Sequence, residues 1–267
     1  MTIFEMYERR PKNFIKISIV LSIILLLILW SISGIEYKGI ASKGSEVAYG
    51  IVYGITHPDT NLLFTTSTDG VPYLILQTIA IAILGTIFGA ILAVPVSFLS
   101  SKNIVNKYVA FIFSSLVLMI RTIPSLVWAL VWIRVTGPGP FCGVVTQSIC
   151  SIGMISKMFV TAIEDLDTGI LESLDASGCN TFEKIRYGVI PQLSASFVST
   201  TIYRFDINLK DATTLGIVGA GGIGAALVQS ISSRRWAMVG SFLSALILLV
   251  LIIEYFSTKL RNKLARG

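Results

Sequence analysis

The residues with the clearest chemical potential are polar and charged side chains set inside a segment that is otherwise apolar. They fall within residues 203–211 and are Arg204, Asp206, Asn208, Lys210 and Asp211. At about 100° per residue, Arg204, Asn208 and Asp211 share one helix face. Asp206 and Lys210 share roughly the opposite face, at the i,i+4 spacing of an ion pair. Charges in membrane-spanning helices are costly and face protein or water. Two interpretations stay open: internal ion pairing, or a polar pathway for an anionic solute.

A second candidate for such a pathway is Arg121, which is followed by Thr-Ile-Pro124. A proline just beyond a buried arginine can open a helix and free backbone groups toward a cavity. We therefore include Arg121 and Pro124 with the residues of the 203–211 segment as candidate pathway residues.

A polar stretch from Glu172 to Gln192 lies between apolar segments, so it must form a folded loop at one membrane face. Acidic residues, which favour a helix N-terminus, cluster toward its front: Glu164, Asp165, Asp167, Glu172 and Asp175. Gly178 interrupts this helix. Residues 181–184 indicate a second short helix that ends before Pro191, because proline resists continuation of a helix. The sequence thus predicts a projecting helix-turn-helix that a partner protein can bind.

Residues 215–227 read LGIVGAGGIGAAL, and their central glycines are Gly219, Gly221, Gly222 and Gly224. Gly219, Gly221 and Gly224 match the G-x-G-x-x-G pattern of dinucleotide sites. No alternating strand precedes them and no acidic residue follows about 20 positions later, so we reject that interpretation. The chain also lacks the G-x-x-x-x-G-K-[ST] pattern of a P-loop. We interpret the segment as a tight, flexible turn where backbones of two subunits approach and the pathway closes.

The composition is that of a membrane protein. Hydrophobic residues make up 54% of the chain, charged residues 13%, and the mean hydropathy is +0.79. A helix needs about 20 apolar residues to cross a bilayer. Six spans are expected, at Phe14–Ile35, Pro72–Leu99, Tyr108–Val135, Val144–Ile163, Leu193–Leu215 and Trp236–Ser257. The fold class is therefore an all-α polytopic membrane protein.

Basic residues near the chain ends set the expected orientation. They are Arg9, Arg10, Lys12 and Lys16 before the first span, and Lys259, Arg261, Lys263 and Arg266 after the last. By the positive-inside rule both termini are cytoplasmic, which requires an even number of spans. The loops at 99–107 and 164–192 then also lie in the cytoplasm. Arg234 and Arg235 would lie on the outer side, which runs against the positive-inside rule. The net charge of +6 thus comes mostly from basic residues that orient the chain in the membrane, and it does not indicate nucleic-acid binding.

The chain divides into four parts. Residues 1–35 form a cytoplasmic N-terminus and an anchor helix, and residues 36–71 form an external connector. Residues 72–257 form a five-span core, and residues 258–267 form a basic cytoplasmic tail. In the core, Gly85 and Gly89 make a G-x-x-x-G pair, which favours close helix packing within the subunit.

The connector carries an apolar pattern of its own. Ile40, Val47, Ile51 and Ile55 recur at near-helical spacing and predict an amphipathic helix on the outer surface. No metal site is expected, because the topology separates Cys179 from the other two cysteines. A disulfide between Cys142 and Cys150 stays open but is disfavoured.

Several of these motifs together resemble a known family. The spacing of Glu172, Gly178 and Pro191 is similar to the loop E-A-A-x3-G-x9-I-x-L-P of permease subunits in binding-protein-dependent ABC importers. The segments RTIPSLVWAL, GPGPFCGV, IRYGVIPQ and YRFDINLKDATTLGIVGAGGIG resemble the permease of phosphonate importers, a type I importer. The departures are Ser173 and Leu174 for two alanines, Gly188 for isoleucine, Ile190 for leucine, and Asp206 for the usual glutamate.

The resemblance implies a homodimer, two cytoplasmic ATPases and an extracytoplasmic solute-binding protein. It places the coupling to the ATPase on Glu172, Gly178, Arg186, Ile190 and Pro191, in cytoplasmic coupling helices. The chain itself would bind no cofactor, since ATP and magnesium belong to the ATPase. Arg121 and Arg204 suit a phosphorus oxyanion, because guanidinium matches phosphate geometry. The alternatives are a stand-alone ion-coupled transporter or channel, and a membrane enzyme, for which no nucleophile–base or metal constellation is visible.

Overall fold

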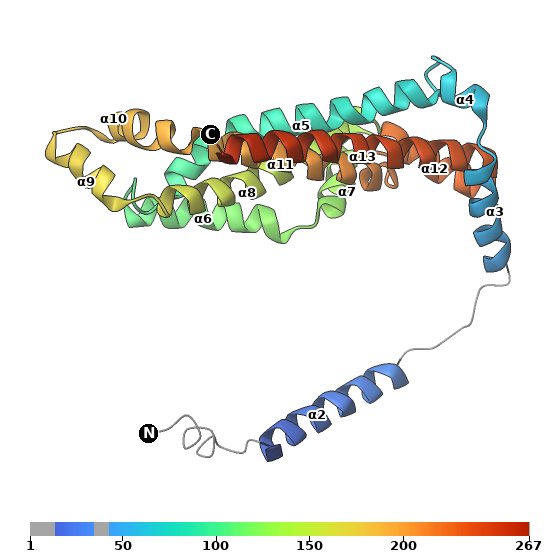
Figure 1. Ribbon diagram of the computed structural model, residues 1–267, viewed down its shortest axis with the longest axis horizontal. Helices are drawn as coiled ribbons and strands as arrows, with labels where there is room; N and C mark the ends of the chain where they lie inside the picture. The colour runs from blue at the N-terminus through green and yellow to red at the C-terminus, as the bar shows by residue number, and fades with distance from the viewer. Residues whose placement is uncertain (1–13, 35–42, 267) are drawn as a thin grey trace. The chain divides into compact units, whose positions relative to one another are not determined.

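The computed structural model describes residues 14–34 and 43–266, which form helices and connecting loops (Figure 1). These residues contain no strand, as expected for an all-α protein. The chain divides into two units, residues 1–48 and 49–267. The basic residues Arg9, Arg10 and Lys12 and the apolar Ile40 lie outside the described residues.

The first unit contains α2 (Phe14–Ser33), which matches the predicted anchor helix. Its 20 residues are almost all apolar, and none of them is buried. A helix of this length rises about 30 Å, which equals the thickness of the bilayer hydrocarbon core. The exposed apolar surface of α2 therefore suits contact with lipid.

The second unit begins within α3 and contains the remaining helices. In chain order they are α3 (Gly44–Thr56), α4 (Thr60–Phe64), α5 (Val71–Ser100), α6 (Lys107–Thr122), α7 (Ser125–Thr136), α8 (Pro140–Glu164), α9 (Thr168–Ala176), α10 (Thr181–Glu183), the π-helix η1 (Lys184–Val189), α11 (Ile190–Gly216), α12 (Gly222–Ser232) and α13 (Trp236–Arg266). Within this unit α5, α8, α11 and α13 run lengthwise, with α9 and α10 at one end and α4 and α12 at the other (Figure 1).

Four of the described helices are long and apolar enough to cross a membrane: α2, α5, α8 and α13. A fifth span forms if α6 and α7 count as one, although they meet at 90°. The span predicted at Tyr108–Val135 is therefore present as a bent pair of helices and not as one straight helix. Pro124 precedes α7 and forces Ile123 into an extended conformation, so the helix breaks there. The 27 residues of α11 are long enough for the sixth predicted span, but they are less apolar and carry four charges.

The helices α5 and α8 approach closely because small residues face each other. A Cβ atom at Gly85 would lie 2.5 Å from Cβ of Gln147, and one at Gly89 would overlap Ser151. The predicted G-x-x-x-G contact is thus confirmed as packing within the subunit. The helix α11 packs beside both, with Leu209 in a buried cluster with Ala82.

A helix also forms in the connector, but it packs through glycine. Gly50 and Gly54 of α3 are buried, and a Cβ atom at either would collide with Trp236. Ile55, which belongs to the apolar pattern of the predicted surface helix, is 44% exposed. Glycine has no apolar side chain, so hydrophobic periodicity does not reveal this contact with α13.

The basic tail predicted at 258–267 is not a separate segment. The helix α13 continues through it to Arg266. Its last turns lie at the end of the unit that carries α9 and α10 (Figure 1). There the guanidinium of Arg261 lies over the ring of Tyr203 at 5.3 Å from the centroid, which ties the tail to α11.

Candidate functional site

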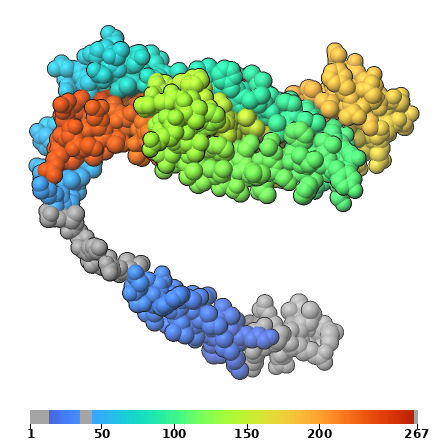
Figure 2. All heavy atoms as spheres, turned by 180° about the vertical axis from the view of Figure 1, so that it is seen from behind, coloured from blue at the N-terminus to red at the C-terminus, as the bar shows by residue number. Residues whose placement is uncertain are grey.

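The loop between α8 and α11 forms a small folded unit at one end of the bundle. Figure 2 shows it extending beyond the neighbouring helices. The side chain of Asp167 caps α9 by accepting a hydrogen bond from the backbone N–H of Gly169 at 2.9 Å. Glu164 and Asp165 belong instead to the end of α8, so the predicted acidic helix start reduces to Asp167.

Gly178 ends α9 in a defined turn. It has φ +79°, and its N–H donates to the carbonyl of Asp175, while the N–H of Cys179 donates to the carbonyl of Leu174. These two bonds make a Schellman motif, which requires a left-handed residue just after the helix. A Cβ atom at Gly178 would meet nothing within 4 Å, so the turn demands glycine for its backbone angle and not for space.

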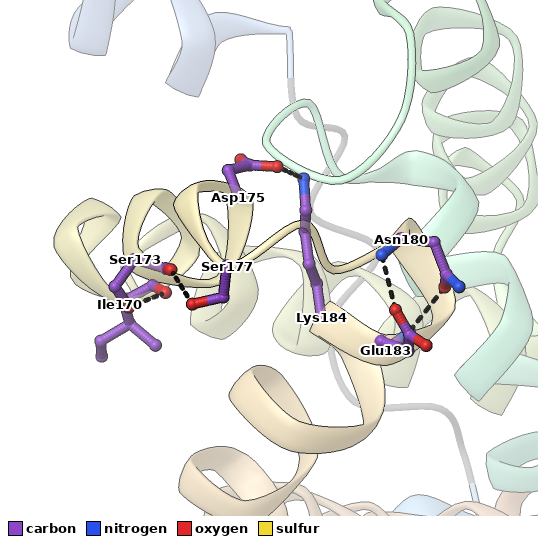
Figure 3. A network of polar contacts seen from close by, with 7 residues as sticks. All are labelled: Ile170, Ser173, Asp175, Ser177, Asn180, Glu183 and Lys184. Carbon is purple, nitrogen blue, oxygen red and sulfur yellow. Dashed lines mark hydrogen bonds and ion pairs between the residues drawn. The ribbon is translucent and has the colours of Figure 1, made fainter.

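The second half of the loop is fixed by reciprocal hydrogen bonds and an ion pair (Figure 3). Asn180 and Glu183 form a capping box, in which each side chain accepts a hydrogen bond from the backbone N–H of the other. Lys184 pairs with Asp175 across the turn. The loop is therefore held in one geometry by contacts of its own.

The predicted end of this second helix before Pro191 is wrong. The chain runs from α10 through η1 into α11 without a break, and Pro191 lies in the first turn of α11. The N–H of Ile190 donates to the carbonyl of Ile185, five residues back. Proline normally breaks a helix by removing a donor and clashing with the carbonyl four residues earlier. The wider π turn just before Pro191 relieves that conflict.

The departures from the family loop at Leu174 and Gly188 form a packed pair. A Cβ atom at Gly188 would lie 2.7 Å from Cδ1 of Leu174. The residue at 174 is larger than the alanine of the family pattern, and the residue at 188 is smaller than its isoleucine. The two changes thus compensate each other in volume, and Gly188 is buried.

The remaining coupling candidates lie on the loop surface. Glu172, Arg186, Ile190 and Pro191 are all exposed. Two exposed aromatic side chains accompany them: Phe182 is 69% exposed and Tyr187 is 63% exposed. The sequence analysis did not select these aromatics, although an aromatic residue within a polar loop is itself a signal of an interface.

The loop is anchored on the bundle through the 101–106 connection. The backbone N–H of Lys102 donates to the Glu164 carboxylate at 3.1 Å, and the Asn103 amide donates to the carbonyl of Ile163 at 2.7 Å. Beneath these bonds a buried apolar cluster includes Phe98 and Leu171. The loop is therefore bonded directly to the end of α8 and to the connection that follows α5.

The polar side chains of α11 are divided between two environments. One face is buried against α5 and α8. Arg204 Nε donates to Ser151 Oγ at 3.0 Å, and Asn208 Nδ2 donates to the hydroxyls of Ser151 and Thr86, both at 2.8 Å. Gln147 donates to the backbone carbonyl of Asn208 at 2.7 Å. We call Thr86, Gln147, Ser151, Arg204 and Asn208 the α11 network.

The other face forms the ion pair that the spacing predicted. Lys210 Nζ lies 3.5 Å from Asp206 and 3.2 Å from Glu254 of α13. Asp206 is buried, whereas Lys210 is exposed. Asp211, half-buried, completes the charged stretch. The partners were not among the predicted site residues, because they lie on other helices: Thr86, Gln147, Ser151 and Glu254.

Arg121 contrasts with Arg204. It lies in the last turn of α6, just before the bend, and its side chain is exposed instead of buried as expected. A Cβ atom at Gly153 would lie 2.9 Å from Cγ of Arg121, so the aliphatic part of the Arg121 side chain packs against the α8 backbone at this glycine. Trp128 donates to the carbonyl of Ile120 at 3.3 Å and thereby holds the bend.

The glycine-rich turn joins α11 to α12 within one chain. Gly219, Gly221 and Gly222 all have positive φ. A Cβ atom at Gly224 would collide with the backbone of Thr213 on α11. Close backbone approaches thus occur here inside one chain, and the approach expected between two subunits stays a prediction.

The same turn is also closed to phosphate. The backbone N–H groups of Gly222 and Ile223 donate to the side chains of Gln77 and Thr78 at 2.8 and 2.9 Å. A dinucleotide site needs such donors free at the start of the helix. The Gly139 N–H donates to the carbonyl of Gly219 at 2.8 Å, so the GPGP segment packs on this turn.

Cys142 and Cys150 are free thiols, so the disfavoured disulfide between them does not form in this structure.

Comparisons with known proteins place these features in a family. A protein of Stutzerimonas stutzeri assigned as a phosphite transport system permease, HtxC, is 32% identical over 95% of this chain and 87% of its own length. The phosphate-import permease PhnE of Mycolicibacterium smegmatis is 32% identical over 70% of this chain, which covers 36% of that protein. In structure, the inward-facing MetNI methionine ABC transporter matches 71% of this chain and 94% of its own chain, with a TM-score of 0.63 and 21% identity.

The structural match at this identity establishes the fold, which is that of a type I importer permease. A family model for the inner membrane component of binding-protein-dependent transport systems matches residues 85–264, from the middle of α5 almost to the end of α13. This chain therefore belongs to the family of binding-protein-dependent transport system inner membrane components.

Proposed function

We propose that this permease moves a phosphorus oxyanion, such as phosphonate or phosphite, across the cytoplasmic membrane. As a member of its family the chain is a multi-pass transport subunit, and ATP hydrolysis belongs to a partner subunit. The observation that carries the choice of solute is the 32% identity to a phosphite permease across 95% of the chain. Both similar permeases are named for a phosphorus oxyanion, phosphite in one and phosphate in the other.

The loop from α9 to η1 is the proposed contact with the ATPase. Its coupling candidates Glu172, Arg186, Ile190 and Pro191 are exposed, while the capping box and the Schellman turn fix its shape. Exposed Phe182 and Tyr187 supply aromatic surface of the kind that anchors protein interfaces. Such a preorganised projection loses little conformational entropy on docking.

In this proposal two copies of the chain pair with two ATPases on the cytoplasmic face and with a solute-binding protein on the outer face. The loop, the 101–106 connection and the end of α13 share one end of the second unit, as the positive-inside assignment requires for the cytoplasmic side. ATP and magnesium bind the ATPase alone. The glycine-rich turn, which contains Gly219–Gly224, lies toward the opposite end and serves as the gate candidate.

Arg121 is the proposed contact for the anion, and Arg204 has a structural role. Arg204 is 6% exposed, and its guanidinium already donates to Ser151 and Met154. Arg121 is exposed at a helix break, where backbone groups of Thr122 and Ile123 leave the helix. A guanidinium in that position can bind an oxyanion with two parallel hydrogen bonds.

Paired substitutions test this division of roles. Arg121→Gln should lower ATP-dependent phosphonate uptake about tenfold or more, the loss expected for a charged hydrogen bond of roughly 1.5–3 kcal/mol, with unchanged amounts of folded protein. Arg204→Gln should instead lower the thermal midpoint of the purified protein, because it leaves Ser151 and the buried α11 network short of a donor. Normal uptake by the Arg121 variant would remove Arg121 from the pathway.

The family assignment supports this function over a stand-alone ion-coupled transporter. Of the charges that motivated the alternative, Arg204 is hydrogen-bonded inside the bundle, and Asp206 and Lys210 form an ion-pair cluster with Glu254.

A further inference from the structure

The outer surface of α13 changes character along its length in a regular order. Leu251, Tyr255, Lys259 and Lys263 follow each other at four-residue intervals, and all are exposed. Residues four apart on a helix lie on one face. This stripe is therefore aliphatic, then aromatic, then twice basic. From Tyr255 to Lys263 it advances about 12 Å along the helix axis.

The neighbouring charges on α13 are engaged elsewhere. Glu254, the acid beside this stripe, has its carboxylate 3.2 Å from Lys210 Nζ. Arg261 points the other way, with its guanidinium over the ring of Tyr203 and within reach of the Thr258 hydroxyl. Lys259 and Lys263 thus present positive charge that the described acids of this helix do not neutralise.

We propose that this stripe is a binding site for one anionic phospholipid. Leu251 lies against the acyl chains, Tyr255 lies at the depth of the glycerol backbone, and Lys259 and Lys263 bind the phosphate. The order matches the layers of a leaflet, in which aromatic residues occupy the interface and lysines extend to the headgroups. Phe256, 61% exposed, widens the aromatic layer.

Two further observations favour a lipid as the occupant. The helix α13 is long and apolar enough to cross a membrane, so its flank must meet lipid or protein there. The side chains of the stripe line an open surface, and every described residue that lines this surface belongs to α13. Two lysines at the headgroup layer match the charge of an anionic lipid and offer no advantage to a zwitterionic one. Phospholipid bound here would hold the end of α13 beside the start of α11.

Native mass spectrometry of the purified full-length protein in a neutral detergent tests the site. The probes are phosphatidylglycerol and phosphatidylcholine with identical acyl chains. The wild-type chain should retain phosphatidylglycerol preferentially. Lys259→Gln/Lys263→Gln should weaken phosphatidylglycerol binding about thirtyfold, given roughly 1 kcal/mol for each lysine near a lipid surface, and should leave phosphatidylcholine binding unchanged.

The matched control is Lys102→Gln/Lys107→Gln, which removes two exposed lysines at the same end of the second unit. Its phosphatidylglycerol binding should stay within twofold of wild type. Equal losses in the two double variants would overturn the site, because only net charge would then matter. Displacement of the lipid by inorganic phosphate at constant ionic strength would assign the lysines to a free anion. Intact lipid binding with failed capture of the ATPase would assign them to that protein.

Discussion

At the scale of single residues, the loop depends on backbone angles and volumes more than on charged contacts. Gly178 is required by a positive φ in open space, and Gly188 by the side chain that covers it. Arg204 and Arg121 look equivalent in the sequence, yet one is bonded inside the bundle and the other is exposed at a bend. Residue type alone therefore does not assign a role here, because burial decides what a guanidinium can bind.

Substitutions at Gly178 separate backbone angle from size. Gly178→Val should disrupt the Schellman turn, because a β-branched residue at φ +79° costs roughly 1–2 kcal/mol or more. Stimulation of the ATPase and solute uptake should both fall, by roughly fivefold or more, while membrane insertion stays normal. Gly178→Asn should retain most activity, since asparagine tolerates the left-handed region. Equal activity of the two variants would show that the turn geometry is not needed for coupling.

At the scale of elements, sequence patterns predicted the helices better than their joints. The helices α2, α5, α8 and α13 were expected from apolar length, and each begins within a few residues of its predicted bound. An opening of the helix at Pro124 was expected, but its 90° angle and the continuous passage through Pro191 were not. One proline breaks a helix and the other does not, because a π turn precedes the second. That difference depends on hydrogen bonding that spacing does not encode.

The polar segments of the candidate site were predictable from the sequence, but their partners on other helices were not. The loop and the charged stretch were found because polar residues are conspicuous among apolar ones. The partners of Arg204 and Asn208 were not found, because Ser151 and Thr86 come from other helices and small hydroxyl residues are common in membrane spans. Gly50 and Gly54 were missed because close packing leaves no mark in an apolar pattern.

The contact between α9 and η1 makes a prediction at this scale. Gly188→Ile should overpack the contact with Leu174 and destabilise the protein by about 1–3 kcal/mol. Leu174→Ala/Gly188→Ile should recover most of that loss, because the smaller residue restores the room. Thermal unfolding of the purified protein measures stability, and uptake measures function. A double variant as impaired as the two single variants combined would contradict volume compensation.

At the scale of the whole molecule, the second unit connects a projecting loop to a set of buried polar contacts. The loop rests on the ends of α5 and α8 through Lys102 and Asn103, and the α11 network joins those same helices to α11. Packed and hydrogen-bonded elements thus connect the loop continuously to α11. This arrangement suits a transport subunit whose energy comes from another chain.

Reconstituted transport is the most direct test of the central claim. The full-length chain is placed in liposomes with its partner ATPase and solute-binding protein, and uptake of labelled phosphonate and phosphite is measured. We predict uptake only when all three components are present and ATP is supplied on the face that carries the α9–η1 loop. Uptake by the chain alone, driven by an ion gradient and indifferent to ATP, would contradict the account.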